Sequence, residues 1–467
     1  MNNRIIGKSF IPMLLLSPLS VIAQEKASQD RPNVIYIMAD DLGIGDLGCY
    51  GQKQIKTPSI DRLAANGMLF AQHYSGSTVS APSRCALLTG KHTGNSYIRG
   101  NKGVVSPDGS RYDEPLKADE VTVAEIFKRK DYATACVGKW GMGGPGSEGH
   151  PNLQGFDYFF GYLGQSNAHR YYPDFLWENA TKINLNKEKY SPYLMLEKTL
   201  GFIEQNKGNP FFLYYAPTLP HADLLVPDNE LEQYKGCFSE PLMAEYGAFY
   251  KQPEPRATYA AMVSRLDKDV ELIIKSLKEK GLLDNTIVIF TSDNGVHSVG
   301  GHNPDYFDSN GPFRGNKRDL YEGGIRTPFI VHWPEQIQPG SVSHHVSAFW
   351  DFLPTACELL GEDVPLSSNG ISYLPTLTSK GEQRKHDYLY WEFHEQGGKQ
   401  ALLKENWKLI RLFVNEPDKT RLELYNLSSD PAELMNSANQ YPEKTKELER
   451  LLDDAHSRSD LFTFKHE

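Results

Sequence analysis

The sequence is poor in cysteine and carries no concentration of positive charge. Its 467 residues include five cysteines, none of which forms a C-x-x-C pair, so neither a disulfide framework nor a thiolate zinc site is expected. The formal net charge is −10 without a basic cluster, which argues against nucleic acid as a partner. Internal repeats and low-complexity tracts are also absent. Past the N-terminus, no apolar run approaches the roughly 20 residues that a membrane span requires.

One apolar run stands at the N-terminus itself. Arg4 and Lys8 precede the run, and residues 21–23 (V-I-A) have small side chains suited to cleavage. This pattern is typical of a secretory signal peptide over residues 1–23. We therefore expect an exported protein, located in the periplasm or secreted.

Short continuous apolar runs alternate with amphipathic stretches along the rest of the chain. Residues 33–39, 210–216 and 286–292 are typical of strands buried on both faces. Residues 257–280 instead repeat apolar side chains at the helical period. This alternation predicts an α/β fold with a mostly parallel central sheet flanked by helices.

Acidic and amide side chains follow two of these predicted strands. Asp40 and Asp41 come after the first, and Asp293 and Asn294 after the run 286–292. Either pair alone also fits a simple loop cap. Because ligands of open α/β sheets bind at the carboxyl ends of strands, a shared metal site is the competing interpretation. An all-oxygen set suits Ca²⁺ or Mg²⁺ and disfavours zinc or copper.

The stretch from Ser80 to Gly90 (S-A-P-S-R-C-A-L-L-T-G) has clear helix boundaries. Ser80 is the expected N-cap, Pro82 suits the first turn, and Gly90 ends the helix. A helix N-terminus favours an anion, and Arg84 one turn later adds a cation. A capped helix with a solvated arginine is the plainer alternative.

The same stretch resembles the motif of the type I sulfatases: Cys or Ser, any residue, Pro or Ala, Ser and Arg, with a Leu-Thr-Gly ending. In that family the first residue is oxidised after translation to formylglycine, the nucleophile, so Ser80 makes this chain similar to the serine-type variant. The resemblance runs from about residue 33 to residue 455. It implies a large alkaline-phosphatase-like domain and a smaller C-terminal α+β domain with a short antiparallel sheet and one helix.

The resemblance also implies roles for single residues. Lys139 and Lys317 match the sulfate-binding lysines, and His221 matches a histidine that contacts the transferring sulfate or protonates the leaving group. The implied catalytic residues are Ser80, Arg84, Lys139, His221 and Lys317, and the implied metal ligands are Asp40, Asp41, Ser80, Asp293 and Asn294. Ca²⁺ is the expected ion, with Mg²⁺ the second candidate.

One position departs from the family. The usual segment Gly-Lys-Trp-His reads Gly-Lys-Trp-Gly here, so Gly141 stands where the family has a histidine that touches the formylglycine. We expect His169 or His297 to reach into that space.

Residues 155–173 combine aromatic and polar side chains, as sugar sites do, although a packed loop fits as well. The segment around residues 391–399 could present His394 to the substrate, although a purely structural role fits as well. The expected substrate-binding residues are Asn167, His169, Arg170, His297 and His394. Family habit favours a sulfated carbohydrate, with galactose or N-acetylgalactosamine sulfate preferred.

The expected organisation is a signal peptide over residues 1–23, a catalytic domain over 24–366, a Ser-, Gly- and Pro-containing linker over 367–380 and a small domain over 381–467. In the small domain, alternating segments predict antiparallel strands, and a helix is expected near residues 442–455.

The expected chemistry needs the modification of Ser80. A formylglycine hydrate carries two hydroxyls on one carbon, whereas a plain serine would be trapped as a sulfate ester. An oxygen-independent maturing enzyme would act on Ser80 before export. Two alternatives remain: a phosphomonoesterase or phosphodiesterase of the same superfamily, and an inactive glycan-binding homologue.

Overall fold

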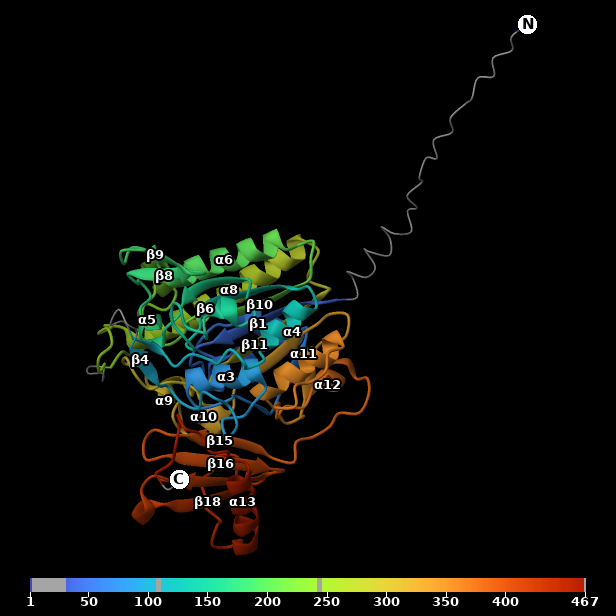
Figure 1. Cartoon of the computed structure of the whole chain (residues 1–467). Helices are drawn as coiled ribbons and strands as arrows, with labels where there is room; N and C mark the ends of the chain where they lie inside the picture. Colours follow the sequence, from blue (N-terminus) through green and yellow to red (C-terminus); the bar gives the residue numbers. More distant parts are fainter. Residues whose placement is uncertain (2–30, 106–110, 242–245, 466–467) are drawn as a thin grey trace.

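The computed structural model describes residues 1, 31–105, 111–241 and 246–465. It contains a large α/β domain and a small domain built on an antiparallel sheet (Figure 1). The expected signal peptide lies, apart from Met1, outside the described residues. In the described part of the chain, no helix combines the length and the apolar character needed to cross a membrane.

A ten-stranded sheet forms the centre of the large domain, in the order β13-β2-β12-β11-β1-β10-β6-β7-β8-β9. β1 (Asn33–Ala39) lies between β10 (Phe211–Ala216) and β11 (Thr286–Ser292) and is parallel to both. β6 (Ala133–Lys139) continues the parallel set beside β10. Every residue of β1, β10 and β11 is buried, which explains their continuous apolar sequences.

The outer strands are mixed in direction. β7 (Tyr158–Tyr162) is parallel to β6, but β8 (Phe175–Glu178) and β9 (Thr181–Asn184) turn back as an antiparallel edge. At the other edge, β12 (Phe329–His332) and β2 (Met68–Phe70) each run antiparallel to their inner neighbour, and β13 (Ser341–Ser343) is parallel to β2. The prediction of a mostly parallel sheet is confirmed for its centre.

Helices cover both faces of the sheet (Figure 1). Ile35 and Ile37 of β1 belong to the same apolar cluster as residues of α2 (Pro58–Ala65), α6 (Ser191–Gln205) and α8 (Pro255–Glu279). The alternate residues of β1 face a second cluster, which includes α3 (Ser80–Thr89), α4 (Val123–Arg129) and α11 (Phe352–Leu360). The two-residue period of the strand thus divides the core into two layers.

Shorter elements complete the large domain: β3 (His73–Tyr74), β4 (Gly103–Val105), β5 (Arg111–Asp113), β14 (Ser347–Ala348), α5 (Gln165–Ala168), α7 (Asp228–Leu231), α9 (Pro304–Phe307) and α10 (Glu322–Ile325). Within residues 367–380, α12 (Leu374–Thr378) packs on the large domain, where Tyr373 and Leu377 are buried.

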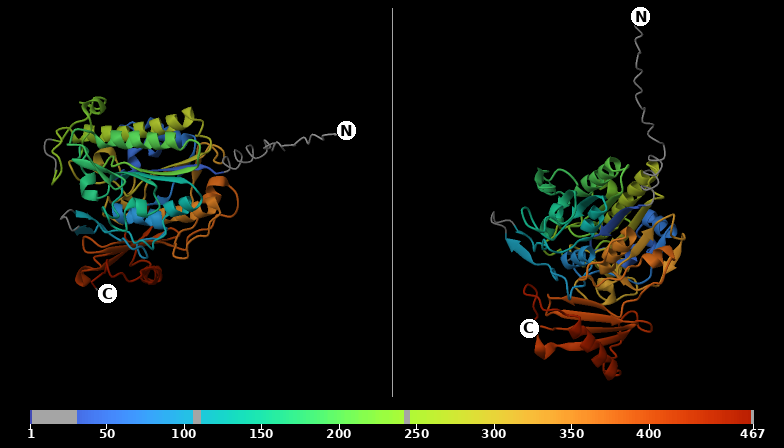
Figure 2. Two further views of the ribbon diagram at one scale, coloured as in Figure 1. Left: turned by 45° about the horizontal axis from the view of Figure 1, so that its top comes forward. Right: turned by 45° about the vertical axis from the view of Figure 1, so that its right-hand side comes forward.

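The small domain is a four-stranded antiparallel meander with one helix (Figure 2). Its strands are β15 (Leu389–Phe393), β16 (Lys399–Lys404), β17 (Trp407–Leu412) and β18 (Arg421–Asn426). One face packs on α13 (Pro442–Asp454), and the other packs on the large domain around Tyr74 and Trp350. The predicted antiparallel sheet with one helix is confirmed.

A buried ion cluster joins the two domains. Lys408 of β17 lies 2.9 Å from Glu322 of α10 and 2.9 Å from Glu433, and all three side chains have no exposed surface. Burial raises the pKa of Glu433 to about 7, although Lys408 opposes the shift. Glu322 is also paired with Arg326 at 3.0 Å, so Lys408 matters most for Glu433.

We expect Lys408→Met to lower the free energy of unfolding by about 3–5 kcal/mol, because it leaves a buried carboxylate without its cation. Lys404→Met is the matched control, since its partner Glu447 is solvent-exposed, and it should change stability little. Urea unfolding of both variants measures the difference. Equal stability of the two variants would contradict the importance of the buried cluster.

Candidate active site

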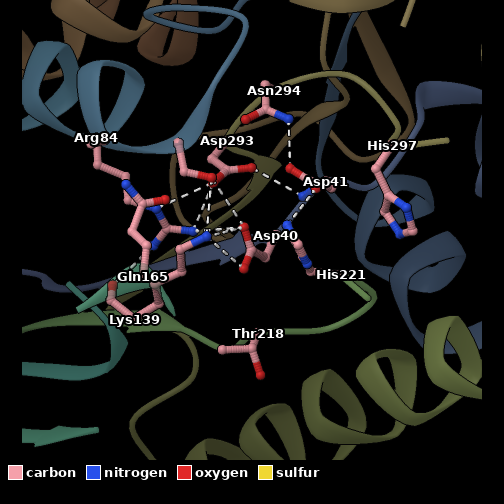
Figure 3. Close-up of polar contacts among 12 residues, drawn as sticks. Asp40, Asp41, Arg84, Lys139, Gln165, Thr218, His221, Asp293, Asn294 and His297 are labelled. Carbon is pink, nitrogen blue, oxygen red and sulfur yellow. Dashed lines mark hydrogen bonds and ion pairs between the residues drawn. The ribbon is translucent and has the colours of Figure 1, made fainter. Parts of the chain in front are cut away.

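Four acidic or amide side chains meet where the central strands end (Figure 3). Ala39 of β1 pairs with Ser292 of β11, so the residues that follow the two strands are neighbours. The backbone N–H of Asp41 donates to Asp293 Oδ1 at 3.0 Å. The strand register thus produces the cluster that the sequence predicted.

The cluster has the composition of a hard-cation site. Carboxylate oxygens of Asp40, Asp41 and Asp293 all lie within 4.8 Å of one another, and these residues are fully buried. Asn294 donates through Nδ2 to Asp41 Oδ1 at 2.7 Å, whereas its buried Oδ1 has no hydrogen-bond partner among the described residues. An oxygen acceptor without a donor beside three carboxylates fits a metal ion, and the oxygen-only donors fit Ca²⁺ or Mg²⁺.

Cationic side chains surround the same acids. Lys139, the last residue of β6, places Nζ 2.8 and 2.9 Å from the two Asp40 oxygens. Lys317 Nζ lies 2.7 Å from Asp41 Oδ2. Burial raises the pKa of Asp40 to about 7 against the opposing charge of Lys139. Burial would also raise the pKa of Asp41, but Lys317 and His221 hold it well below its usual value.

Arg84 is part of this charge cluster. It projects from α3, has no exposed surface, and donates from its Nη2 to Asp293 Oδ2 at 2.8 Å. Its Nη1 donates to the backbone oxygen of Lys139 at 3.0 Å. The alternative of a solvated arginine is therefore wrong.

Ser80 lies at the start of α3, inside the cluster. The helix begins at Ser80 and its N-cap is Val79, so the expected capping role of Ser80 is wrong by one residue. Gly90, at φ 69°, ends the helix as predicted. Ser80 Oγ accepts from Lys139 Nζ at 3.1 Å and lies 3.3 Å from Asp40 Oδ1. The residue is completely buried.

Three histidines form a stack beside the acids. The His221 ring lies 4.5 Å from that of His169 and 5.4 Å from that of His297. His221 Nε2 is 3.1 Å from Lys317 Nζ. Burial lowers the pKa of His221 well below its usual value and that of His169 to about 3, so both rings are neutral near pH 7.

The space beside Gly141 is filled by Gln165. A Cβ added to Gly141, whose φ is +78°, would lie 3.0 Å from Gln165 Cγ. His169 stacks on His221 instead, and His297 Nε2 lies 3.2 Å from the backbone oxygen of Pro220. The expectation that a histidine occupies this space is therefore wrong. The side chain in this space is the Gln165 amide, which cannot act as a base and comes from the first residue of helix α5.

A cavity of about 350 Å³ lies beside the acidic cluster. Its lining includes His221 and Lys317, which both contact Asp41. His169 also lines it, whereas Asn167 lies half-buried in α5 and Arg170 is exposed next to it. His297 is buried behind His221. The remaining described residues that line the cavity are Asn101, Gly103, Arg111, Tyr112, Asp113, Gln165, Ser166, Phe249, Val299 and Arg318.

His394 lies elsewhere. It belongs to the small domain, its Nε2 is 2.8 Å from the buried carboxylate of Glu392, and its ring stacks on Phe464 at 4.2 Å. It is not among the described residues that line the cavity. These contacts give His394 a packing role.

Asn101 and Asp113 line the cavity without belonging to any stretch that the sequence singled out. Gln165 lies within residues 155–173, a candidate sugar site, but the sequence did not point to this side chain. Each of the three comes from a loop or a short element whose position depends on tertiary contacts. Gly141 was a further signal, because a missing side chain in a packed site has to be replaced by another group.

Comparison with known proteins agrees with this geometry. Residues 32–362 match the family model described as Sulfatase, and residues 312–458 match the model described as N-sulphoglucosamine sulphohydrolase, C-terminal. The first match spans more than half of the chain. The second includes Lys317 and most of the small domain.

Individual proteins are similar over most of the chain. The N-acetylgalactosamine-6-O-sulfatase of Bacteroides thetaiotaomicron is 30% identical, covering 92% of this chain and 94% of its own. Human N-acetylgalactosamine-6-sulfatase is 32% identical over 74% of this chain, an alignment that covers 66% of the human protein. The solved structure of Ps i-CgsB in complex with k-i-k-neocarrahexaose has a TM-score of 0.77 and 27% identity, covering 91% of this chain and 92% of that one. The chain belongs to the sulfatase family, as a formylglycine-type member and a sulfuric ester hydrolase.

Proposed function

We propose that this protein is an exported sulfatase that hydrolyses sulfate monoesters of carbohydrates, with a formylglycine formed from Ser80 as its nucleophile. The observation that carries the proposal is the convergence of Lys139 and Asp40 on Ser80 Oγ, at 3.1 and 3.3 Å. Lys317, which contacts Asp41 of the same cluster, also lines the neighbouring cavity. Few structural roles require a serine hydroxyl buried between a lysine and a carboxylate.

The charge distribution suits sulfuryl transfer. Negative charge on the sulfate oxygens must be held through the transition state, so the site needs cations and donors in fixed positions. Arg84, Lys139 and Lys317 supply them without exposure to bulk water, where the same charges would be screened. The N-terminus of α3 adds its backbone dipole.

Formylglycine, when formed, supplies a geminal diol, so that one hydroxyl can attack sulfur and the other can lose its proton to release sulfate. The departing sugar oxygen also needs a proton. Lys317 and His221 lie 3.1 Å apart and both line the cavity, so this pair is positioned to donate it.

A bound metal ion would supply positive charge beside the nucleophile. Asp40, Asp41, Asp293 and Asn294 would hold it together with the modified Ser80. We favour Ca²⁺ over Mg²⁺, because Ca²⁺ tolerates the irregular oxygen sets that neighbouring loops provide, whereas Mg²⁺ demands near-octahedral geometry.

The proposed substrate is a sulfated glycan or glycosaminoglycan, with galactose or N-acetylgalactosamine sulfate preferred. Two similar proteins are named N-acetylgalactosamine-6-sulfatase and N-acetylgalactosamine-6-O-sulfatase, which supports this preference. We place the protein in the periplasm or outside the cell, on the strength of residues 1–23. Complete burial of Ser80 supports modification before folding. The serine at this position supports an oxygen-independent maturing enzyme, which fits an anaerobic bacterial host.

Two other functions are less well supported. A phosphomonoesterase or phosphodiesterase with two zinc ions needs several histidine ligands, but the metal cluster found in the described residues consists of three aspartates. A glycan-binding protein without activity would keep Ser80 unmodified.

We expect a chelator to abolish activity and lower the melting temperature, because it exposes three buried carboxylates to mutual repulsion. Added Ca²⁺ at about 1,000 times its Kd should restore about 4 kcal/mol of stability. Thermal unfolding and sulfate release, each measured with Ca²⁺ and with Mg²⁺, test the preference. Two zinc ions in each active chain, found by elemental analysis, would overturn the sulfatase proposal.

We expect Ser80 to be two hydrogens lighter in protein from the native host, measured by peptide mass spectrometry. Protein made without a matching maturing enzyme should bind sulfated sugar but turn over negligibly, and so should Ser80→Ala. Ser429→Ala, at an exposed serine of the small domain, is the matched control. Many turnovers by protein with unmodified Ser80 would disprove the mechanism.

A further inference from the structure

We propose that Asn101, Asp113 and Gln165 form one wall of the cavity that binds the ring hydroxyls of the sugar carrying the sulfate. This inference rests on the proposed sulfatase function and adds a substrate-recognition site to it. All three residues line the cavity that also contains His221 and Lys317.

The wall is fixed directly to the nucleophile. Asn101 Oδ1 accepts the backbone N–H of Ala81 at 3.2 Å, and Ala81 follows Ser80 in the chain. The same oxygen accepts from Gln165 Nε2 at 2.9 Å. A group bound to these amides is therefore held at a defined distance from the reacting atom.

Gln165 connects the other two members. Its backbone N–H donates to Asp113 Oδ2 at 2.8 Å, and its side chain extends across the face of Gly141. An alanine at residue 141 would bring its Cβ within 3.0 Å of Gln165 Cγ. The loss of the family's histidine thus makes room for a side chain that reaches the cavity from α5 (Figure 3).

The internal bonds of the wall leave polar atoms for a ligand. Asn101 Nδ2 and Gln165 Oε1 make no hydrogen bond to any residue that the structure describes, and the Asp113 carboxylate, which accepts from Gln165, has further acceptor capacity. Together these groups offer one donor and two acceptors on one surface. Neighbouring hydroxyls of a pyranose, each both donor and acceptor, match such a set.

Asp113 favours a hydroxyl over a second anion. Burial raises its pKa to about 6, although hydrogen bonds from Gln165 and the nearby positive charge of Lys139 oppose the shift, so a further donor would stabilise the carboxylate. A sugar hydroxyl would supply one, and such a bond to a charged acceptor is stronger than a neutral one. His169 and Phe249, whose rings lie 5.6 Å apart, add apolar surface for the C–H groups of the ring.

The test uses the mature enzyme with its best sulfated saccharide and a series of monodeoxy analogues of that saccharide. Asp113→Asn and Gln165→Met retain the shape of the wall but change its acceptors. The control substitutions Asp363→Asn and Gln233→Met lie on the exposed surface. Inorganic sulfate, measured as a competitive inhibitor, reports on the sulfate subsite independently of the sugar.

We expect each wall variant to lose about tenfold or more in kcat/KM with the intact saccharide, mainly through KM. With one of the deoxy analogues, kcat/KM of the wild-type enzyme should fall by the same factor. The corresponding variant should show no further fall in kcat/KM with that analogue, because the residue and the missing hydroxyl are the two partners of one hydrogen bond. The inhibition constant of inorganic sulfate should stay within about twofold, because the cations that hold it are untouched.

Three results would overturn the inference. In the first, the loss of kcat/KM caused by the substitution and the loss caused by removing a hydroxyl add together for every analogue. In the second, the wall variants behave like the surface controls. In the third, the inhibition constant of sulfate rises in parallel, which indicates a general loss of site structure. In each case sulfatase activity itself persists. Absence of sulfate release from every saccharide by the mature wild-type enzyme would instead refute the proposed function.

Discussion

The active site depends on the burial of many charges within one small volume. Asp40, Asp41 and Asp293 have no exposed surface, and each lies against a buried or nearly buried cation. Charges removed from water at this density are tolerated only when nearly every one has a partner in fixed geometry. The exception is informative, because Asn294 Oδ1 and the closely spaced carboxylates remain under-compensated without a further cation. Metal binding and folding of this region are therefore coupled.

The sheet satisfies this constraint through its register. Parallel strands β1, β10, β6 and β11 end at one edge, so residues far apart in sequence meet there without strain on the intervening helices. Lys139 enters the site because it is the last residue of β6, whereas Asp40 and Asp293 follow their strands directly. The reversals of strand direction lie outside these four strands: β12, directly beside β11, and β2 on one side, and β8 and β9 on the other.

Sequence reasoning succeeded where chemistry follows directly from local position. The continuous apolar runs identified the central strands, and the acids after them identified the cluster, because a strand end fixes both the place and the direction of the next residue. The motif beginning at Ser80 identified the helix that carries the nucleophile position. Its cap was misplaced by one residue, since helix ends depend on backbone angles that composition does not specify.

The same reasoning failed where a side chain acts from a loop. Nothing near Gln165 indicates that it fills the space beside Gly141, because the contact joins residues 24 positions apart through the packing of α5. For His394 the sequence left two roles open for a related reason: a histidine beside glycines suggests a binding loop, yet the Glu392 carboxylate and the ring of Phe464 contact it inside the small domain, which favours the structural role. Long-range contacts decide both cases.

The small domain is also part of the catalytic apparatus. Lys399 of β16 donates to the backbone oxygen of Arg318 at 2.7 Å, immediately after Lys317. Lys408 of β17 holds Glu322 at the start of α10, on the other side of the same loop. The segment that follows Lys317 is thus held at two points by side chains of the second domain, while the backbone N–H of Lys317 itself donates to Val296 of the large domain. Docking of the small domain therefore helps to fix the loop that delivers Lys317 to Asp41.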